Sequence, residues 1–174
     1  GFDIGSGVGI DSSGNVYVSG NFFSISATFG VLPNLNNADG SGSTRDIFFI
    51  KYDAAGNEQW QSVFTGAGGF NDYLNAVEIN TSGHYYAGGF TENGFNNPDM
   101  WIIKVDGNGS KLWDIALQGT LVGGKDEVTD IYTDNFNNGY AAGYQYNNGT
   151  GQDAALIKFN SSGSILWNKK FTGS

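Results

Sequence analysis

The sequence predicts an all-β protein made of three copies of one four-stranded antiparallel unit. A frame of aspartate, apolar stretch, Ile-Lys and a later tryptophan occurs three times, at Asp46–Trp60, Asp99–Trp113 and Asp153–Trp167. The aspartates are 53 and then 54 residues apart, from 46 to 99 and from 99 to 153. Within each copy, apolar and polar residues alternate and turn signals recur every roughly eight to twelve residues. A repeat of this size indicates units that bury their apolar faces against their neighbours.

The three copies divide the chain at 1–69, 70–123 and 124–174, and the first carries a long loop at 24–45. In the second copy we expect strands at Ala76–Asn80, Tyr85–Phe90, Met100–Val105 and Lys111–Leu117. We find no apolar stripe with the 3.6-residue period of a helix, so the sequence does not favour helices. Each copy is therefore predicted to be two hairpins joined by a loop.

The hairpin turns share one pattern, an Asp or Asn followed by Gly or Asn three residues later. The first side chain can accept hydrogen bonds from the turn backbone, and the Gly or Asn can take the left-handed position. The six turns begin at Asp11, Asp53, Asn80, Asp106, Asp134 and Asn160. We expect all six to lie on the same edge of the molecule.

Four short antiparallel strands, repeated with glycines and aromatics, are typical of a β-propeller blade. The segments Gly14-Asn-Val-Tyr-Val-Ser-Gly20 and Asp46 to Trp60 resemble the bacterial β-propeller repeat known as SBBP, and the resemblance covers the whole chain in three copies. The third copy departs from it with Asn137 where the others have Gly14 and Gly83. The resemblance implies a secreted or cell-surface bacterial protein and no common catalytic activity.

Three blades are fewer than the roughly four to eight of known propellers. We therefore expect an open arc or part of a larger propeller, whose two end faces are covered by further blades of the same parent chain or by a second copy of this chain. The chain opens at Gly1 without a methionine, as a processed or partial chain does.

The charge and composition of the chain narrow the classes of partner that it can bind. The formal net charge is −9 with 8 Lys and Arg, which disfavours binding to nucleic acid or to anionic membranes. The chain has no cysteine, and no apolar run reaches the length of a membrane span.

Six aspartates open the first and third strands of the copies, and blade geometry gathers them on one edge. They are Asp3, Asp72, Asp126, Asp46, Asp99 and Asp153. Such a ring could bind Ca²⁺. The favoured interpretation is that each carboxylate accepts backbone N–H groups in its own loop. We predict neither a metal nor a cofactor.

Recurring aromatic and basic residues also have two interpretations. Tyr17, Tyr86 and Tyr140, with the three repeat tryptophans, could stack on sugars, but packing between adjacent blades is favoured. A lectin would use exposed rings such as Phe22, Phe95 or Tyr146. Lys51, Lys104 and Lys158 are expected to reach carboxylates with their ammonium groups.

The insertion at 24–45 lies on the aspartate edge and mixes apolar with flexible polar residues, a composition that suits a binding loop. Alternatively, Phe29, Val31 and Leu32 cap the blade. The predicted binding face comprises Phe29, Leu32, Asn36, Asp39, Arg45, Phe95 and Tyr146.

No catalytic constellation emerges from the sequence. The one histidine, His84, is expected to be an exposed turn residue, and nothing distinguishes one carboxylate pair for hydrolysis from another. We predict a non-enzymatic scaffold that binds a protein or surface partner; the alternatives are a carbohydrate-binding module and, remotely, a hydrolase.

Overall fold

The computed structural model describes residues 2–38, 40–66, 69–94 and 97–172. Within these residues the chain is all-β and contains no helix, which confirms the predicted class. No helix in the described part could cross a membrane.

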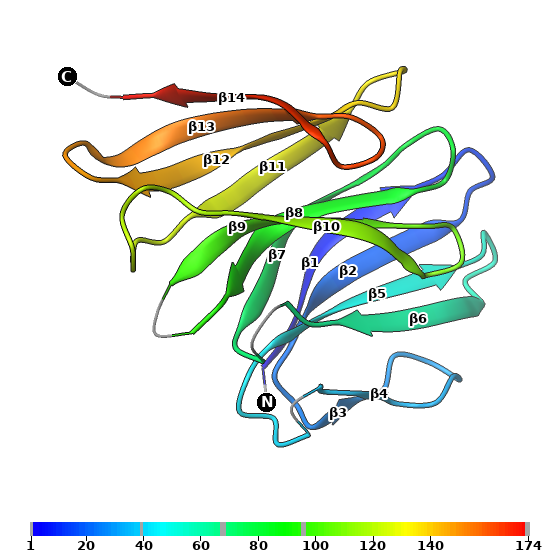
Figure 1. Cartoon of the computed structure of the whole chain (residues 1–174). Coiled ribbons are helices and arrows are strands. Elements are labelled where there is room, and N and C mark those ends of the chain that lie inside the picture. The colour runs from blue at the N-terminus through cyan, green and yellow to red at the C-terminus, as the bar shows by residue number, and fades with distance from the viewer. Residues whose placement is uncertain (1, 39, 67–68, 95–96, 173–174) are drawn as a thin grey trace.

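Three four-stranded sheets lie one after another along the molecule (Figure 1). Neighbouring strands in each sheet are antiparallel and follow the order of the chain. Sheet 1 contains β1 (Asp3–Ile10), β2 (Val16–Phe22), β5 (Asp46–Tyr52) and β6 (Glu58–Phe64). Sheet 2 contains β7 (Asp72–Ile79), β8 (Tyr85–Glu92), β9 (Pro98–Val105) and β10 (Lys111–Leu117). Sheet 3 contains β11 (Glu127–Thr133), β12 (Gly139–Asn147), β13 (Gly151–Phe159) and β14 (Ile165–Phe171).

The insertion at 24–45 forms a fourth, two-stranded sheet from β3 (Ser26–Ala27) and β4 (Leu35–Asn36). The expectation of three sheets alone was therefore wrong. Figure 1 shows this small hairpin beside sheet 1, at the end of the molecule opposite sheet 3.

Strand β10 has the predicted bounds, whereas β7, β8 and β9 are longer than predicted. Strand β7 begins at Asp72 rather than at Ala76, and its pairing with β8 shifts register between Leu74 and Ala76. Such a bulge breaks the period-two pattern, because residues beyond it change faces. Equivalent shifts occur in β1, between Gly5 and Gly7, and in β11, between Val128 and Asp130.

The six hairpin turns have the predicted chemistry. In the first, the Asp11 Oδ1 atom accepts hydrogen bonds from the Ser13 and Asn15 N–H groups at 2.9 and 3.0 Å. The third residue after each opening Asp or Asn has a positive φ. In the third copy this residue is Asn137, at 62°, so asparagine replaces glycine without changing the turn.

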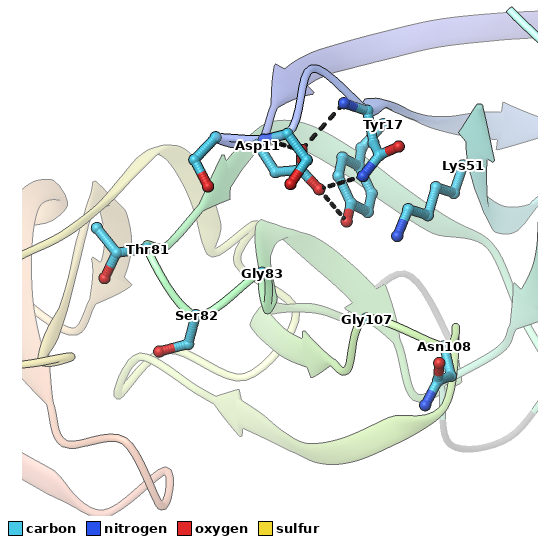
Figure 2. Close-up of a pocket in the computed structure, with 11 residues that line it drawn as sticks. Asp11, Tyr17, Lys51, Thr81, Ser82, Gly83, Gly107 and Asn108 are labelled. Atoms are coloured by element: carbon cyan, nitrogen blue, oxygen red, sulfur yellow. Dashed lines mark hydrogen bonds between the residues drawn. The ribbon is translucent and has the colours of Figure 1, made fainter. Parts of the chain in front are cut away.

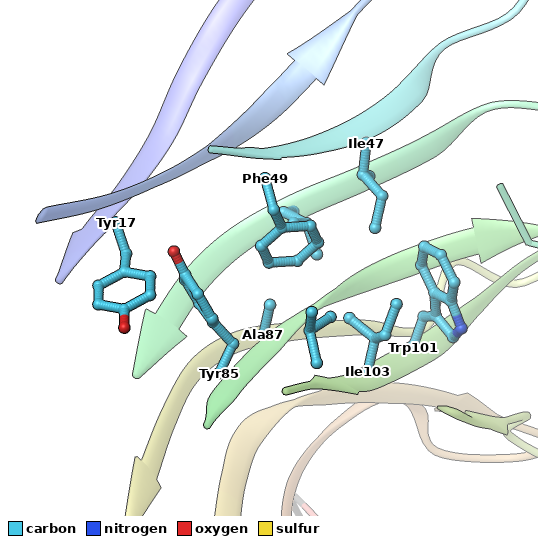
Figure 3. Close-up of a cluster of buried hydrophobic side chains, with 9 residues drawn as sticks. Tyr17, Ile47, Phe49, Tyr85, Ala87, Trp101 and Ile103 are labelled. Carbon is cyan, nitrogen blue, oxygen red and sulfur yellow. The ribbon is translucent and has the colours of Figure 1, made fainter. Parts of the chain in front are cut away.

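Aromatic and branched side chains fill the space between successive sheets. Between sheets 1 and 2, at what we call junction 1, Tyr17, Ile47 and Phe49 pack against Tyr85 and Trp101 (Figure 3). Junction 2, between sheets 2 and 3, repeats this arrangement with Tyr86, Met100 and Ile102 packed against Ile157 and Phe159. Strand β7 lies against both β1 and β11, so the first strands of the sheets are neighbours.

Candidate functional site

The loops between copies and the loops between second and third strands meet at one edge, which we call the loop edge. Here the N–H of Asp72 donates to the Arg45 carbonyl oxygen at 2.8 Å, and the N–H of Asp126 donates to that of Pro98 at 2.8 Å. An aspartate at the start of each following sheet is thus tied to the beginning of the third strand of the preceding one, next to β5 at Arg45 and in β9 at Pro98.

Two of the strand-opening carboxylates accept backbone N–H groups of their own loops, as the favoured interpretation predicts. The Asp72 Oδ2 atom accepts the Gly66 N–H at 2.6 Å, and the Asp126 Oδ2 atom accepts the Gly119 N–H. The Asp126 Oδ1 atom also accepts the N–H of Tyr146 on β12 at 2.6 Å. Burial raises the pKa of Asp72 to about 6, and the nearby Asp46 carboxylate adds to this. No group of three or more His, Asp or Glu residues in the described part could hold a metal ion.

Glycine at position 66 is required by a close approach. A Cβ atom there would lie 1.9 Å from the Thr91 hydroxyl and 2.8 Å from the Asp72 carboxylate. Only a residue without a side chain lets the loop reach the carboxylate at this point.

The predicted binding-face residues do not form one cluster. Phe29 packs on Phe48 with ring centroids 4.4 Å apart. Leu32 is half-buried, and Asn36 is exposed on β4. Arg45 lies at junction 1, with its guanidinium over the rings of Phe23 and Tyr73 at 5.4 and 4.9 Å. Tyr146 belongs to sheet 3, where its carbonyl oxygen accepts the Leu121 N–H at 3.1 Å. Asp39 and Phe95 lie outside the described residues.

Hydrogen bonds hold the insertion against sheet 1. The Glu58 Oε2 atom accepts the N–H groups of Val31 and Leu32 at 2.8 and 3.1 Å, and the Tyr52 hydroxyl donates to the Phe29 carbonyl at 3.0 Å. Inside the insertion, the Asn37 N–H donates to the Ile25 carbonyl at 2.9 Å. The loop is therefore a positioned hairpin rather than a free tether.

Two apolar side chains of the insertion point to solvent, Ile25 at 60% and Val31 at 89% exposure. A hollow of about 300 Å³ between Phe29, Val31 and Tyr52 borders the second of them. Sequence reasoning missed Ile25 and assigned Val31 to a cap, whereas Phe29 does pack on the sheet. The two-residue strands that fix these orientations carry no recognisable periodicity.

The opposite edge, which carries the hairpin turns, is hollowed at junction 1 (Figure 2). A polar depression of about 420 Å³ is lined by the Asp11 turn, Lys51 and the two turns of sheet 2. Burial alone would raise the pKa of Asp11, but hydrogen bonds from Asn15, Tyr17 and the Ser13 N–H outweigh it and lower the pKa to about 2. The Lys51 ammonium lies 5.0 Å from the centre of the Tyr17 ring.

The equivalent place at junction 2 is closed. The Lys104 ammonium lies 5.0 Å from the centre of the Tyr86 ring and donates to the Ser161 carbonyl at 2.9 Å. The Trp113 Nε1–H donates to the same oxygen at 3.1 Å. Lys104 is buried, and this burial lowers its pKa. The expectation that the repeat lysines reach carboxylates was wrong, because tyrosine rings and a turn carbonyl are their partners.

The repeat aromatics of the first two copies pack between sheets, as predicted, whereas in the third copy Trp167 packs on Tyr140 of its own sheet. Trp60 contacts Tyr85 across junction 1 with centroids 5.8 Å apart, and Trp113 contacts Phe159 across junction 2 at 5.6 Å. Among the rings considered for a lectin, Phe22 is fully buried, so that assignment was wrong. The insertion covers its side of sheet 1, which the sequence pattern did not reveal.

His84 is half-buried rather than exposed, which corrects the expectation from its turn position. Burial lowers its pKa, with a smaller lowering from Lys104. The side chain therefore favours the neutral form near pH 7.

No protein-family model matches the chain, and no curated protein is significantly similar to it.

Proposed function

We propose that this chain is a non-enzymatic scaffold of β-propeller blades, secreted or displayed on a bacterial surface, which binds a protein or surface partner through its insertion. The three four-stranded meanders with neighbouring first strands support the assignment as blades. The motif resemblance supports the extracellular location. Junctions built from the repeat residues support a structural role for those residues, which leaves partner recognition to segments outside the repeat.

The observation that carries the proposal is the pair of exposed apolar side chains on a braced hairpin. Ile25 and Val31 stand out from a segment whose backbone is held by Glu58 and Tyr52. A preorganised loop loses little conformational entropy on binding, and exposed apolar side chains supply contact area.

The test compares three variants of this chain. Ile25→Asp and Val31→Asp each place a charge on the insertion. The control, Phe136→Asp, places a charge at a side chain that is 86% exposed on the edge that carries the hairpin turns. Surface proteins of the source bacterium are crosslinked to each variant and the captured partner is quantified. We expect at least a tenfold loss for the insertion variants and none for the control. Equal capture by all three would remove the insertion as the partner site.

A second candidate function is recognition of a neutral saccharide at the polar depression. It is favoured by the contrast between Lys51, which borders the depression, and Lys104, which is closed over by Ser161. Hydroxyl groups of Ser12, Ser13 and Ser82 belong to residues of the same lining and could bond sugar hydroxyls.

A glycan array tests this alternative, with Lys51→Met as the variant and Lys158→Met, the equivalent residue of sheet 3, as the control. Glycan binding that Lys51→Met abolishes and Lys158→Met preserves would support it. A folded protein that binds no glycan would exclude it. The remote alternative, a hydrolase, requires turnover that a single carboxylate substitution abolishes.

A further inference from the structure

Sheet 3 brings a lysine, an asparagine and an aspartate from three different strands into contact. Strand β12 ends at Asn147, β13 contains Asp153, and Lys170 lies near the end of β14, the outermost strand (Figure 1). The Lys170 Nζ atom donates to the Asn147 Oδ1 atom at 2.8 Å. The Asn147 Nδ2 atom donates to the Asp153 Oδ2 atom at 2.9 Å. One asparagine amide therefore lies between a basic and an acidic side chain.

The amide and the carboxylate lie away from solvent. Asn147 is 8% exposed, and Asp153 is 2% exposed. The Asp153 Oδ1 atom is buried and has no hydrogen-bond partner among the described residues. Buried polar atoms without a partner are rare in folded proteins, and one reason for them is a chemical role.

Thr120 donates hydrogen bonds to the same amide oxygen. Its N–H group and its hydroxyl group each lie 3.2 Å from the Asn147 Oδ1 atom. The Asn148 N–H donates to the Thr120 hydroxyl oxygen at 3.0 Å and orients it. Two donors that converge on a carbonyl oxygen stabilise the negative charge that develops there when a nucleophile attacks the carbon.

Lys170 is placed as that nucleophile. Because its Nζ atom lies 2.8 Å from the Asn147 Oδ1 atom, it lies about 3.5–4 Å from the Cγ atom. Reacting atoms are about 3–3.5 Å apart in productive geometries, so a small movement of the side chain is enough. Lys170 is exposed, so its ammonium group can lose a proton to solvent and react as the free amine. The Asp126 carboxylate attracts the ammonium form, so the reaction should be faster at alkaline pH.

The second copy of the repeat has only part of this arrangement. Asn93 occupies the position of Asn147, and its Nδ2 atom donates to the Asp99 Oδ2 atom at 2.5 Å. Ala116 occupies the position of Lys170. The contact between asparagine and aspartate therefore belongs to the repeat, whereas the lysine is an addition of the third copy.

We propose that Lys170 and Asn147 form an intramolecular isopeptide bond, which links the edge strand β14 to β12 across β13. The free amine attacks the Asn147 Cγ atom. The Nζ–Cγ bond forms, and the π electrons of the carbonyl group move to Oδ1, where Thr120 stabilises them. Both nitrogens are then bonded to one carbon, so the Asp153 carboxylate beside Nδ2 takes a proton from Nζ and passes it to Nδ2. The Cγ–Nδ2 bond breaks, its electron pair leaves with ammonia, and the C=O bond forms again.

The product is a secondary amide between two side chains, and the reaction consumes no oxidant and no cofactor. It gives the chain a covalent link that it cannot make with cysteine, since it has none. The reaction occurs once in each molecule, so it is compatible with a non-enzymatic scaffold. It is also independent of partner binding by residues 24–45, which lie at the opposite end of the molecule.

Intact-mass spectrometry of the purified chain tests the proposal. The chain is incubated at about pH 9, which raises the fraction of free amine. We expect a mass lower than that of the sequence by one molecule of ammonia, and a peptide map that joins the segments containing Asn147 and Lys170. Lys170→Arg keeps the positive charge but should retain the full mass. The matched control is Lys169→Arg, at the neighbouring exposed lysine, which should form the bond as wild type does.

Two further variants test the assigned roles. Asp153→Asn should slow bond formation at least about tenfold, because the proton relay is lost. Thr120→Val should slow it less, because the backbone N–H remains. Thr120 is exposed, so this variant decides the matter if Asp153→Asn does not fold. Bond formation at the wild-type rate in both folded variants would overturn the assigned mechanism.

A wild-type chain that keeps its full mass after incubation would overturn the proposal. Loss of ammonia that persists in Lys170→Arg would also overturn it, because it would indicate a cyclic imide at Asn148-Gly149 instead.

Discussion

The ammonium group of Lys104 donates a hydrogen bond to the carbonyl oxygen of Ser161 at 2.9 Å, which fastens strand β9 to the last hairpin turn of sheet 3. The lysine is 6% exposed, so water cannot easily replace this bond. The repeat supplies a natural comparison, because Lys51 occupies the same position beside an open depression.

Lys104→Met should lower the free energy of unfolding by about 1.5–3 kcal/mol, the range for a hydrogen bond to a charged group. Methionine keeps the apolar stem, so packing is largely retained. Lys51→Met is the control and should change stability by less than about 0.5 kcal/mol, as for a solvated group. Urea unfolding of the two variants measures the difference, and equal effects would argue against the Ser161 bond as the cause.

Asp72 should make stability depend on pH in a defined direction. Its folded pKa of about 6 lies above the ordinary pKa of an aspartate, 3.8, so the folded state binds the proton more tightly than the unfolded chain does. Its contribution to stability is therefore complete below the unfolded pKa and decreases as the pH rises toward the folded pKa.

Asp72→Asn removes this titration. The unfolding free energy of the variant relative to wild type should increase by about 2 kcal/mol between about pH 4 and pH 7. Denaturant unfolding across this range measures the difference between the two proteins at each pH. A constant difference would mean that Asp72 titrates normally in the folded state.

The repeat tryptophans should differ in their contribution to stability. Trp113→Phe loses the hydrogen bond to Ser161 and part of the packing on Phe159, and should destabilise by about 1–3 kcal/mol. Trp167→Phe should cost less than about 1 kcal/mol, because its ring lies on the outward face of sheet 3. Thermal and urea unfolding compare the pair. A larger loss for Trp167 would show that sheet 3 has a partner in solution.

Substitutions at two turn glycines should distinguish the cost of backbone strain from the cost of a packing clash. Gly56 and Gly109 have φ angles of 84° and 85°. A Cβ atom at Gly56 meets open space, whereas one at Gly109 would lie 2.8 Å from the Trp60 ring. Gly56→Ala should therefore cost about 1–2 kcal/mol, the penalty for the left-handed conformation.

Gly109→Ala should cost more by at least about 1 kcal/mol, since the Trp60 ring must also move. Urea unfolding of both variants provides the comparison. Equal losses of stability would indicate that the Trp60 indole moves aside without cost. Backbone strain at the positive φ would then account for the whole effect of each substitution.

Features set by local chemistry could be predicted from the sequence. The Asp11 turn follows from one side chain bonding its own backbone, and Asn137 tolerates a positive φ where most residues do not. The Asp72 carboxylate likewise accepts a backbone N–H of its own loop, so its structural role could be predicted. The positions of Trp60 and Trp113 between sheets follow from the need of a repeat to bury its faces against neighbours.

Features set by contacts between distant segments could not be predicted. The bulge after Leu74 hid the true start of β7, because it breaks the alternation on which strand prediction depends. Nothing in the sequence around Phe22 indicates that the insertion will cover its side of sheet 1. Nothing in the insertion indicates that the Val31 side chain will point to solvent. The carbonyl partner of Lys104 belongs to a turn 57 residues away.

The meander order of sheet 3 determines how the protein responds to mechanical tension. Strand β14 is paired with β13 and forms the outer edge of its sheet. A force that pulls β14 sideways from β13, within the plane of the sheet, runs along the backbone hydrogen bonds, which are perpendicular to antiparallel strands. These bonds break one pair at a time rather than together. Where hydrogen bonds alone hold β14, we therefore expect the sheet to peel open from this edge at low force.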